Sequence, residues 1–148
     1  MFYPLVIKRD WHWVNPRLHR AICADTKGIV SVNERGEYDA ACVFDAWAPN
    51  SVQAHICIEN PFVIRSGFLH ECFDYVFNQC GRGIMLGPVP SDNKEALRFD
   101  KHIGFTELGR IKDGYDIGID WVILEMRKEN CRWLRKEDGQ QKRQARSA

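Results

Sequence analysis

The sequence predicts a single α/β domain built on a mixed sheet, mostly antiparallel, with hairpins at both ends and helices crossing over in the middle. Three observations predict it. Short stretches of alternating or β-branched apolar residues mark strands, apolar residues at helical spacing mark helices between them, and turn residues separate the segments. The length of 148 residues fits one domain with one core. The expected order is β, α, β-β-β, α, β, α, β-β.

The first helix is expected shortly after an apolar opening at residues 2–7. Asn15 is a candidate N-cap residue, and Pro16 would occupy the first helical position, where a missing N–H costs nothing. A short helix is therefore predicted over residues 15–22.

A hairpin and a further strand are predicted next. Residues 28–33 and 38–47 are rich in β-branched and aromatic residues and flank a glycine-containing turn. Residues 51–59 alternate, with Val52 and the following even-numbered apolar residues on one face and the odd-numbered residues, His55 among them, on the other. This alternation predicts a strand with one face toward the core.

The middle of the chain combines a helix and a strand. Apolar residues recur at helical spacing over residues 67–80, and the glycines that begin at Gly81 end the pattern. Residues 84–89 follow as a strand, which Pro88 and Pro90 are expected to stop. The amphipathic helix should pack on the sheet.

The last part of the domain is a helix and a second hairpin. Asp92 or Asn93 is expected to cap a helix that runs to about Ile103 and ends at a glycine. Residues 106–111 and 117–126 are the predicted strands of the hairpin. Its turn is expected at Lys112-Asp113-Gly114.

The composition is that of a globular protein, with 45% hydrophobic and 28% charged residues. The six cysteines form no CxxC pair and have no metal-ligand spacing, so we expect reduced, buried thiols and no metal site. No basic and apolar leader opens the chain, and no apolar run approaches the roughly 20 residues that span a bilayer. A cytoplasmic protein without membrane contact is therefore predicted.

Charge is unevenly distributed along the chain. Residues 127–148 contain eight Lys or Arg and three Asp or Glu, a net +5, which leaves −4 for residues 1–126. We expect residues 1–134 to form the domain and residues 135–148 a disordered basic tail. Such a tail could contact nucleic acid or an acidic protein, or it could be a solvated end, which is the commoner case.

One segment resembles the signature of the GNAT superfamily of acetyltransferases. Asn93-Lys94-Glu95-Ala96 opens the predicted helix, and Lys101-His102-Ile103-Gly104-Phe105 closes it, which is similar to Asn-x-x-Ala followed by Lys-Leu-Gly-Phe. With the order of elements, the resemblance covers residues from about 26 to 126. It is greatest to small acetyltransferases encoded by bacteriophages, which would place the protein in the host cytoplasm, and to ribosomal-protein acetyltransferases. A capped helix with a glycine stop is the alternative explanation.

The resemblance implies a GNAT-like fold with a splayed parallel strand pair, and transfer of an acetyl group from acetyl-CoA to a primary amine. The acceptor would be a protein N-terminus, a lysine or a small amine, attacking directly in a ternary complex. No metal is implied, and the family often forms dimers. The positions implied for cofactor binding are Cys57, Ile58, Arg65, Ser66, Gly67, Phe68, Asn93, Ala96, Phe99 and Lys101.

The pyrophosphate loop departs from the family pattern. A helix N-terminus favours phosphate through its N–H groups and dipole, and glycine permits close approach of the backbone. Arg65 and Gly67 match the family's loop, but Leu69 stands where a second small residue is usual. A GNAT-like protein that binds CoA or a host partner without catalysis is therefore an alternative, and a nucleic-acid-binding accessory protein is a weaker one.

Two residues are candidates for the general base. Direct attack needs a neutral amine, so a base must remove a proton from the substrate ammonium. His55 and Glu59 are predicted to share the strand face that borders the cleft, and histidine titrates near neutral pH. Asp100 occupies the position of the family's usual tyrosine acid, and an ionised carboxylate is a poor acid unless burial raises its pKa. Trp11 and Trp13, beside the first helix, could contact the acceptor or pack in the core.

Overall fold

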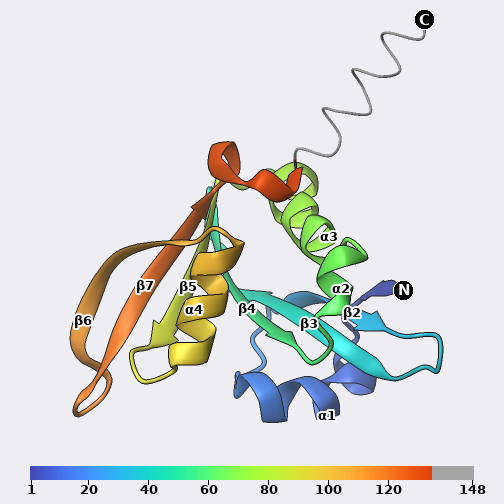
Figure 1. The fold of residues 1–148 in the computed structure, drawn as a ribbon, viewed down its shortest axis with the longest axis horizontal. Helices are drawn as coiled ribbons and strands as arrows, with labels where there is room; N and C mark the ends of the chain where they lie inside the picture. The colour runs from blue at the N-terminus through green and yellow to red at the C-terminus, as the bar shows by residue number, and fades with distance from the viewer. Residues whose placement is uncertain (135–148) are drawn as a thin grey trace, which may run out of the picture.

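Within residues 1–134, which the computed structural model describes, seven strands form one mixed sheet in the order β1-β2-β3-β4-β5-β7-β6 (Figure 1). Among these strands only the β4–β5 pair is parallel. The predicted fold class and the order of its main elements are therefore confirmed. The strands are β1 (Phe2–Pro4), β2 (Lys27–Val32), β3 (Tyr38–Asp45), β4 (Ser51–Ile58), β5 (Ile84–Pro90), β6 (Thr106–Asp116) and β7 (Ile119–Arg127).

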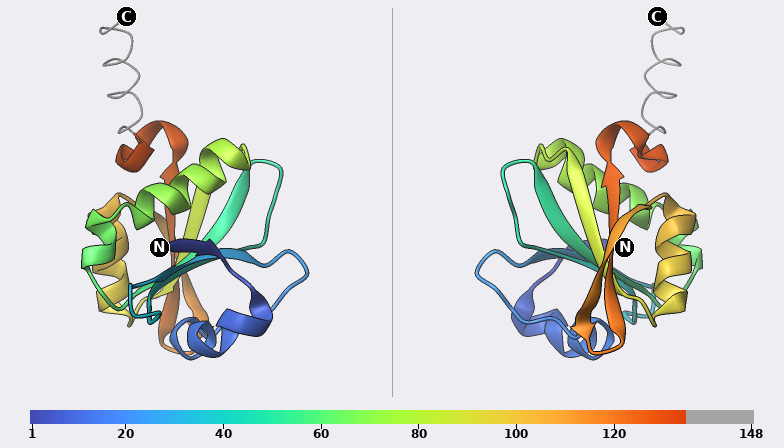
Figure 2. Two further views of the ribbon diagram at one scale, coloured as in Figure 1. Left: turned by 90° about the vertical axis from the view of Figure 1, so that its right-hand side faces the viewer. Right: turned by 90° about the vertical axis from the view of Figure 1, so that its left-hand side faces the viewer.

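Helices cover both faces of this sheet (Figures 1 and 2). The α3 and α4 helices pack on the face that carries the larger core cluster, where Phe44, Phe73 and Phe77 are fully buried. The α1 helix covers the other face through Val14. The helices are α1 (Ile7–Leu18), α2 (Phe62–Arg65), α3 (Phe68–Asp74), a π-helical turn (Tyr75–Gln79), α4 (Lys94–Ile103) and two 3₁₀ turns (Lys128–Asn130 and Arg132–Leu134).

The predicted position of the first helix is wrong. The helix begins at Ile7, where the carboxylate of Asp10 accepts a hydrogen bond of 2.7 Å from the N–H of Val6. Pro16 lies in its last turn instead of its first. A proline there removes one N–H near the end of the helix, and the chain leaves the helix at His19, whose φ is +49°. The sequence rule for proline at a helix start therefore placed the boundary too late.

The predicted turn of the second hairpin is also wrong. Asp113 and Gly114 lie inside β6, in an irregular stretch of its pairing with β7. Asp113 has a φ of +54°, and its carboxylate accepts a hydrogen bond from the N–H of Gly118, which lies in the true turn. A turn signal in the sequence thus marks a bulge here. The β6–β7 hairpin extends beyond the rest of the sheet, on the left of Figure 1.

Several local predictions are confirmed. The first hairpin is β2 and β3, and β4 alternates as expected, with its even-numbered residues against the larger core cluster and Cys57 on the α1 face. The segment predicted as a helix over residues 67–80 is helical, although α2 and the π-helical turn were not foreseen. The six cysteines, all within residues 1–134, form no disulfide, but Cys23 is exposed, so the prediction of burial is wrong for that thiol. In the described part of the chain, no helix is long and apolar enough to cross a membrane.

Candidate functional site

The parallel strands β4 and β5 stay together for only three residue pairs. Ser51–Gln53 pairs with Ile84–Leu86, and no pairing continues beyond these residues, although both strands do. The two strands therefore separate toward their C-terminal ends. The connections to α2–α3 and to α4 leave the sheet at this same edge, since they follow β4 and β5.

Prolines in β5 explain why the pairing stops. Ile84 donates its N–H to Asn50, at the start of β4, whereas Ser91 donates its N–H to β7. Because alternate residues of a strand face opposite neighbours, the even-numbered positions of β5 face β4. Pro88 and Pro90 occupy those positions and have no N–H to donate. The strand ends at Pro90, as predicted from these prolines, but up to that residue β5 stays paired with β7 and loses only its pairing with β4.

A cavity of about 300 Å³ lies where the strands separate. It reaches from the α1 face of the sheet to the α4 face, because residues of both helices line it together with the two strands. The tip of the β6–β7 hairpin adds an aromatic wall. The lining residues that bear on the chemistry are Arg17, Arg20, His55, Asp100, Tyr115 and Trp121.

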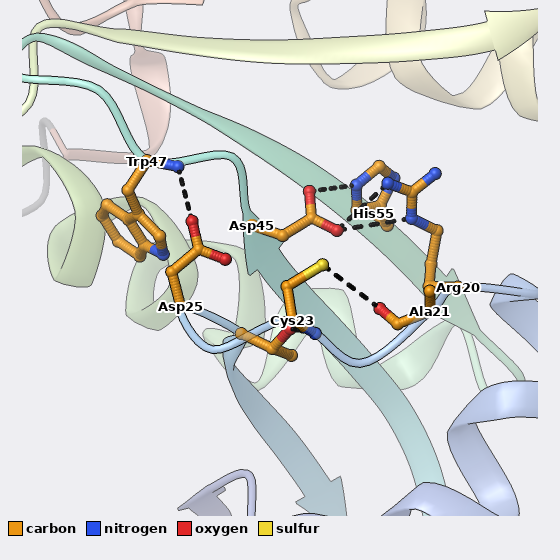
Figure 3. A network of polar contacts seen from close by, with 8 residues as sticks. Arg20, Ala21, Cys23, Asp25, Asp45, Trp47 and His55 are labelled. Carbon is orange, nitrogen blue, oxygen red and sulfur yellow. Dashed lines mark hydrogen bonds and ion pairs between the residues drawn. The ribbon is translucent and has the colours of Figure 1, made fainter.

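On the α1 side of this cleft, His55 belongs to a network of polar groups (Figure 3). Its Nε2 lies 2.9 Å from Oδ1 of Asp45, and its side chain is only 9% exposed. The other carboxylate oxygen, Oδ2, accepts a hydrogen bond of 3.1 Å from Nη2 of Arg20. Burial alone would raise the pKa of Asp45, but the bond to His55 and the charge of Arg20 outweigh it and lower that pKa. Asp45 is therefore ionised at neutral pH.

This arrangement fixes which nitrogen of His55 can act as a base. An ionised carboxylate can only accept hydrogen bonds, so Nε2 of a neutral His55 carries the proton that Asp45 accepts. The other ring nitrogen, Nδ1, then has a free lone pair, and His55 lines the cleft. The pair has the geometry of a histidine base held and oriented by a carboxylate.

Replacing Asp45 with asparagine tests this support. We expect the free energy of unfolding to fall by about 1–3 kcal/mol at pH 7, because the amide of asparagine does not replace the charged hydrogen bonds that the carboxylate makes with His55 and Arg20. The pKa of Asp45 is lowered by folding, so its stabilisation is present above the unfolded pKa and lost as pH falls through the folded pKa. Urea unfolding at pH 7 and pH 3 should therefore show the difference between variant and parent shrinking at pH 3.

Glu59, the second candidate base, is placed differently. It lies just after β4, and its Oε1 accepts a hydrogen bond of 2.6 Å from Nε of Arg17. That guanidinium also lies 4.0 Å from the ring centroid of Trp13. Glu59 is not among the residues that line the cleft. The structure thus brings His55 to the cleft and engages Glu59 with Arg17. Trp13 lies within α1, packs against the smaller core cluster and is not among the residues that line the cleft.

On the α4 side of the cleft lies Asp100. Its carboxyl approaches β5 at Gly87, where an added Cβ would lie 3.9 Å from Oδ2. Within residues 1–134 that carboxyl has no hydrogen-bond or ion-pair partner. Burial raises the pKa of Asp100 to about 7. The condition under which this residue could serve as an acid is therefore met.

The implied cofactor residues divide between the cleft and its surroundings. Asn93 caps α4, and its Oδ1 accepts a hydrogen bond of 3.2 Å from the N–H of Ala96. Lys101 lies outside the cleft and forms an ion pair of 3.5 Å with Glu107. Ile58 packs against the larger core cluster. Four of the implied residues line the cleft, namely Cys57, Asn93, Ala96 and Phe99.

The loop expected to hold pyrophosphate lies at the start of α3. Gly67 precedes the helix with a φ of +98°, which a side chain would strain, and Arg65 and Ser66 are exposed beside it. Phe68 and Leu69 are fully buried, so only their backbone could meet a ligand. None of these residues lines the cleft. The loop thus has an exposed arginine, and a ligand can approach its backbone at Gly67. A buried leucine stands where the family has a small residue.

Some residues at the cleft could not be identified from the sequence. Asp45 contacts His55 because Val43, two residues earlier, pairs with His55 across β3 and β4. Arg17 and Arg20 reach the cleft because α1 ends there. An acidic residue within an apolar strand segment is an unusual feature of a sequence, and it was the one available signal for Asp45.

Only one of the comparisons with known proteins, that with solved structures, gives a match. No family model matches the sequence, and curated protein sequences give no significant match. Solved structures do match. A mutant form of the spermidine/spermine N-acetyltransferase SpeG from Vibrio cholerae is 12% identical, with a TM-score of 0.71, over 87% of this chain and 95% of that one. The chain has the fold of these N-acetyltransferases.

Two further structures show the same likeness. Another mutant of the Vibrio cholerae spermidine N-acetyltransferase is 14% identical, with a TM-score of 0.72, over 93% of this chain and 97% of that one. A chimera of SpeG and hSSAT is 16% identical, with a TM-score of 0.69, over 87% of this chain and 97% of that one. At these identities the likeness concerns the fold, and the chemistry has to be argued from the cleft itself.

Proposed function

We propose that the protein is an acetyl-CoA-dependent N-acetyltransferase that acts on a primary amine. The observation that carries this proposal is the cleft through the sheet, with His55 on its α1 side and Asp100 on its α4 side. A base on one side and an acid on the other suit a reaction in which one proton leaves the attacking group and another joins the leaving group. The shared fold with N-acetyltransferases supports the same function.

In the proposed reaction the acceptor amine, after losing a proton to Nδ1 of His55, attacks the carbonyl carbon of the thioester. The new C–N bond forms, the C–S bond breaks, and the sulfur takes a proton from Asp100. The nitrogen carries a second excess proton after the attack and loses it to solvent. Solvent also returns a proton to Asp100 and removes one from His55, so one proton is released overall. The products are the N-acetylated amine and CoA, so atoms and charges balance. Asp45 holds the tautomer of His55 throughout.

The residues around the cleft fit acetyl-CoA in part. The unpaired edges of β4 and β5 could hydrogen-bond an extended pantetheine arm, and Arg65 with the backbone at Gly67 could meet the pyrophosphate. Leu69, buried in the core, stands where the family has a second small residue in this loop. This departure favours the second candidate, a protein of the same fold that binds CoA or a partner without turnover. The hypothesis of nucleic-acid binding was based on the basic segment of residues 127–148, of which residues 135–148 lie outside the described residues.

Thermal unfolding with and without acetyl-CoA tests the proposal. At about 100 times its Kd, a ligand that binds only the native state adds about 2.7 kcal/mol, which raises Tm by about 5–10 °C for a domain of this size. We also expect release of free CoA thiol when amines are added. No shift at millimolar acetyl-CoA would contradict the proposal. A shift without thiol release across a broad amine screen would favour the non-catalytic candidate.

A further inference from the structure

Two arginines at the end of α1 line the cleft on the same side as His55. Each is held on one edge by a carboxylate. Nε of Arg17 donates to Glu59, and Nε and Nη2 of Arg20 lie 3.4 and 3.1 Å from Oδ2 of Asp45. The side chains are about one-third exposed, at 33% and 31%. Both guanidinium groups are therefore fixed in direction, and both side chains are partly exposed and line the cleft.

Each guanidinium keeps N–H groups that face no protein partner. Nη1 of Arg17 donates to the carbonyl of Trp13, but in residues 1–134 no hydrogen bond engages Nη2 of Arg17 or Nη1 of Arg20. Arginine stays protonated in proteins, so these N–H groups are donors at every relevant pH. Fixed, charged donors of this kind suit a carboxylate, which can accept two parallel hydrogen bonds.

The same side of the cleft offers no free carboxylate. Among the described lining residues the only one is Asp100, which lies on the α4 side of the sheet. The nearby acids Glu59 and Asp45 are already paired with the two arginines. The pairs carry no net charge, so recognition here depends on the direction of the N–H groups. A polyamine, whose second ammonium favours a carboxylate, would find no unpaired one beside His55 among the described lining residues.

The position of Arg20 next to His55 limits the kind of ligand further. His55 and Arg20 bind different oxygens of one carboxylate, that of Asp45, so the imidazole and the guanidinium are neighbours on this side of the cleft. A ligand carboxylate on Arg20 would therefore bring an amine one carbon away close to His55. Tyr115 and Trp121, whose ring centroids lie 5.0 Å apart, form an apolar wall for the rest of a small ligand.

From this arrangement we infer that the acceptor is an α-amino acid, whose carboxylate binds Arg17 and Arg20 while its amine faces His55. The inference rests on the proposed function, because an amino acid that binds here is an acceptor only if the protein transfers acetyl groups. The binding site itself can be tested without turnover. It differs from the polyamine acceptors named for the proteins of similar fold.

The first experiment is equilibrium binding by calorimetry to the full-length protein with CoA present. The probes are L-phenylalanine, L-methionine and L-glutamate, each with its α-carboxamide, and spermidine. We expect at least one amino acid to bind about tenfold or more tightly than its carboxamide, because a hydrogen-bonded charge pair is replaced by a neutral contact. Equal or tighter binding of the carboxamides, or of spermidine, would overturn the inference.

Variants of the two arginines test whether these residues cause the preference for an amino acid over its carboxamide. Arg17→Gln and Arg20→Gln should each reduce the ratio of amino acid to carboxamide affinity severalfold, and the double variant should abolish it. Arg35→Gln, which removes the same charge in the exposed turn between β2 and β3, should leave the ratio unchanged. Tm of each variant reports folding. A ratio that persists in a folded double variant would overturn the assignment to these two residues.

Turnover separates this inference from the proposed function. With acetyl-CoA, the better-binding amino acid should be acetylated faster than its carboxamide, although the amine of the carboxamide is less basic and more of it is neutral. Faster acetylation of spermidine than of every amino acid would overturn the inference and leave acetyl transfer standing. Selective binding of an amino acid with no thiol release would leave the binding site standing and overturn acetyl transfer.

Discussion

Replacing His55 with alanine is expected to lower kcat about 100- to 10,000-fold, the usual contribution of a positioned general base. The amine would then have to lose its proton to water before it attacks. His55 is the residue at the cleft whose Nδ1 is left free by the hydrogen bond to Asp45. Steady-state thiol release at a fixed pH measures the effect.

Glu59→Gln is the matched comparison for this variant. Because Glu59 bonds to Arg17 and does not line the cleft, we expect kcat to change less than about threefold. Acetyl-CoA should raise Tm equally in the parent and both variants, since neither residue is expected to bind the cofactor. A large loss in Glu59→Gln with little loss in His55→Ala would show that the base has been assigned to the wrong residue.

Replacing Asp100 with asparagine is expected to lower kcat with acetyl-CoA about 100-fold, because the thiolate would leave without a proton. The loss should depend on the leaving group. An acetyl thioester of a nitrothiophenol releases a stable thiolate, so the same substitution should slow its reaction only a few-fold. Equal losses with both donors would contradict an acid role and indicate that Asp100 shapes the cleft instead.

The same substitution should change the pH dependence of stability. Burial raises the pKa of Asp100 from 3.8 to about 7, so the folded state keeps a proton that the unfolded state loses between these values. Stability conferred by the protonated form is complete below the unfolded pKa and declines as pH rises toward 7. The amide of the variant does not titrate. In urea unfolding, the free energy of unfolding of the variant relative to that of the parent should therefore rise by about 2–4 kcal/mol between pH 4 and pH 8. A difference that does not change with pH would contradict this.

Patterns in the sequence predicted the structural elements that depend on residues close together in the chain. The alternation of β4 and the cap of α4 at Asn93 were found because each depends on residues a few positions apart. The start of α1 and the turn near Gly118 were missed, since proline and an Asp-Gly pair have more than one use in a fold.

The residues of the site differ in the same way in whether the sequence could predict them. His55 could be selected from its strand face and its chemistry, and it reaches the cleft. Its partnership with Asp45, and the presence of Arg20 beside it, depend on strand register and on where α1 ends, which no short pattern encodes. The acid role considered for Asp100 required its burial to be known, and burial is a property of the assembled core.

The missing N–H groups of Pro88 and Pro90 also bear on how quickly a ligand can enter. Since these residues prevent β5 from pairing with β4, the gap between the strands exists as soon as the chain has folded. A ligand need not wait for a rare open conformation, so its observed association rate should rise in proportion to concentration without reaching a plateau. The two prolines of β5 therefore affect the rate at which a ligand can bind in the cleft.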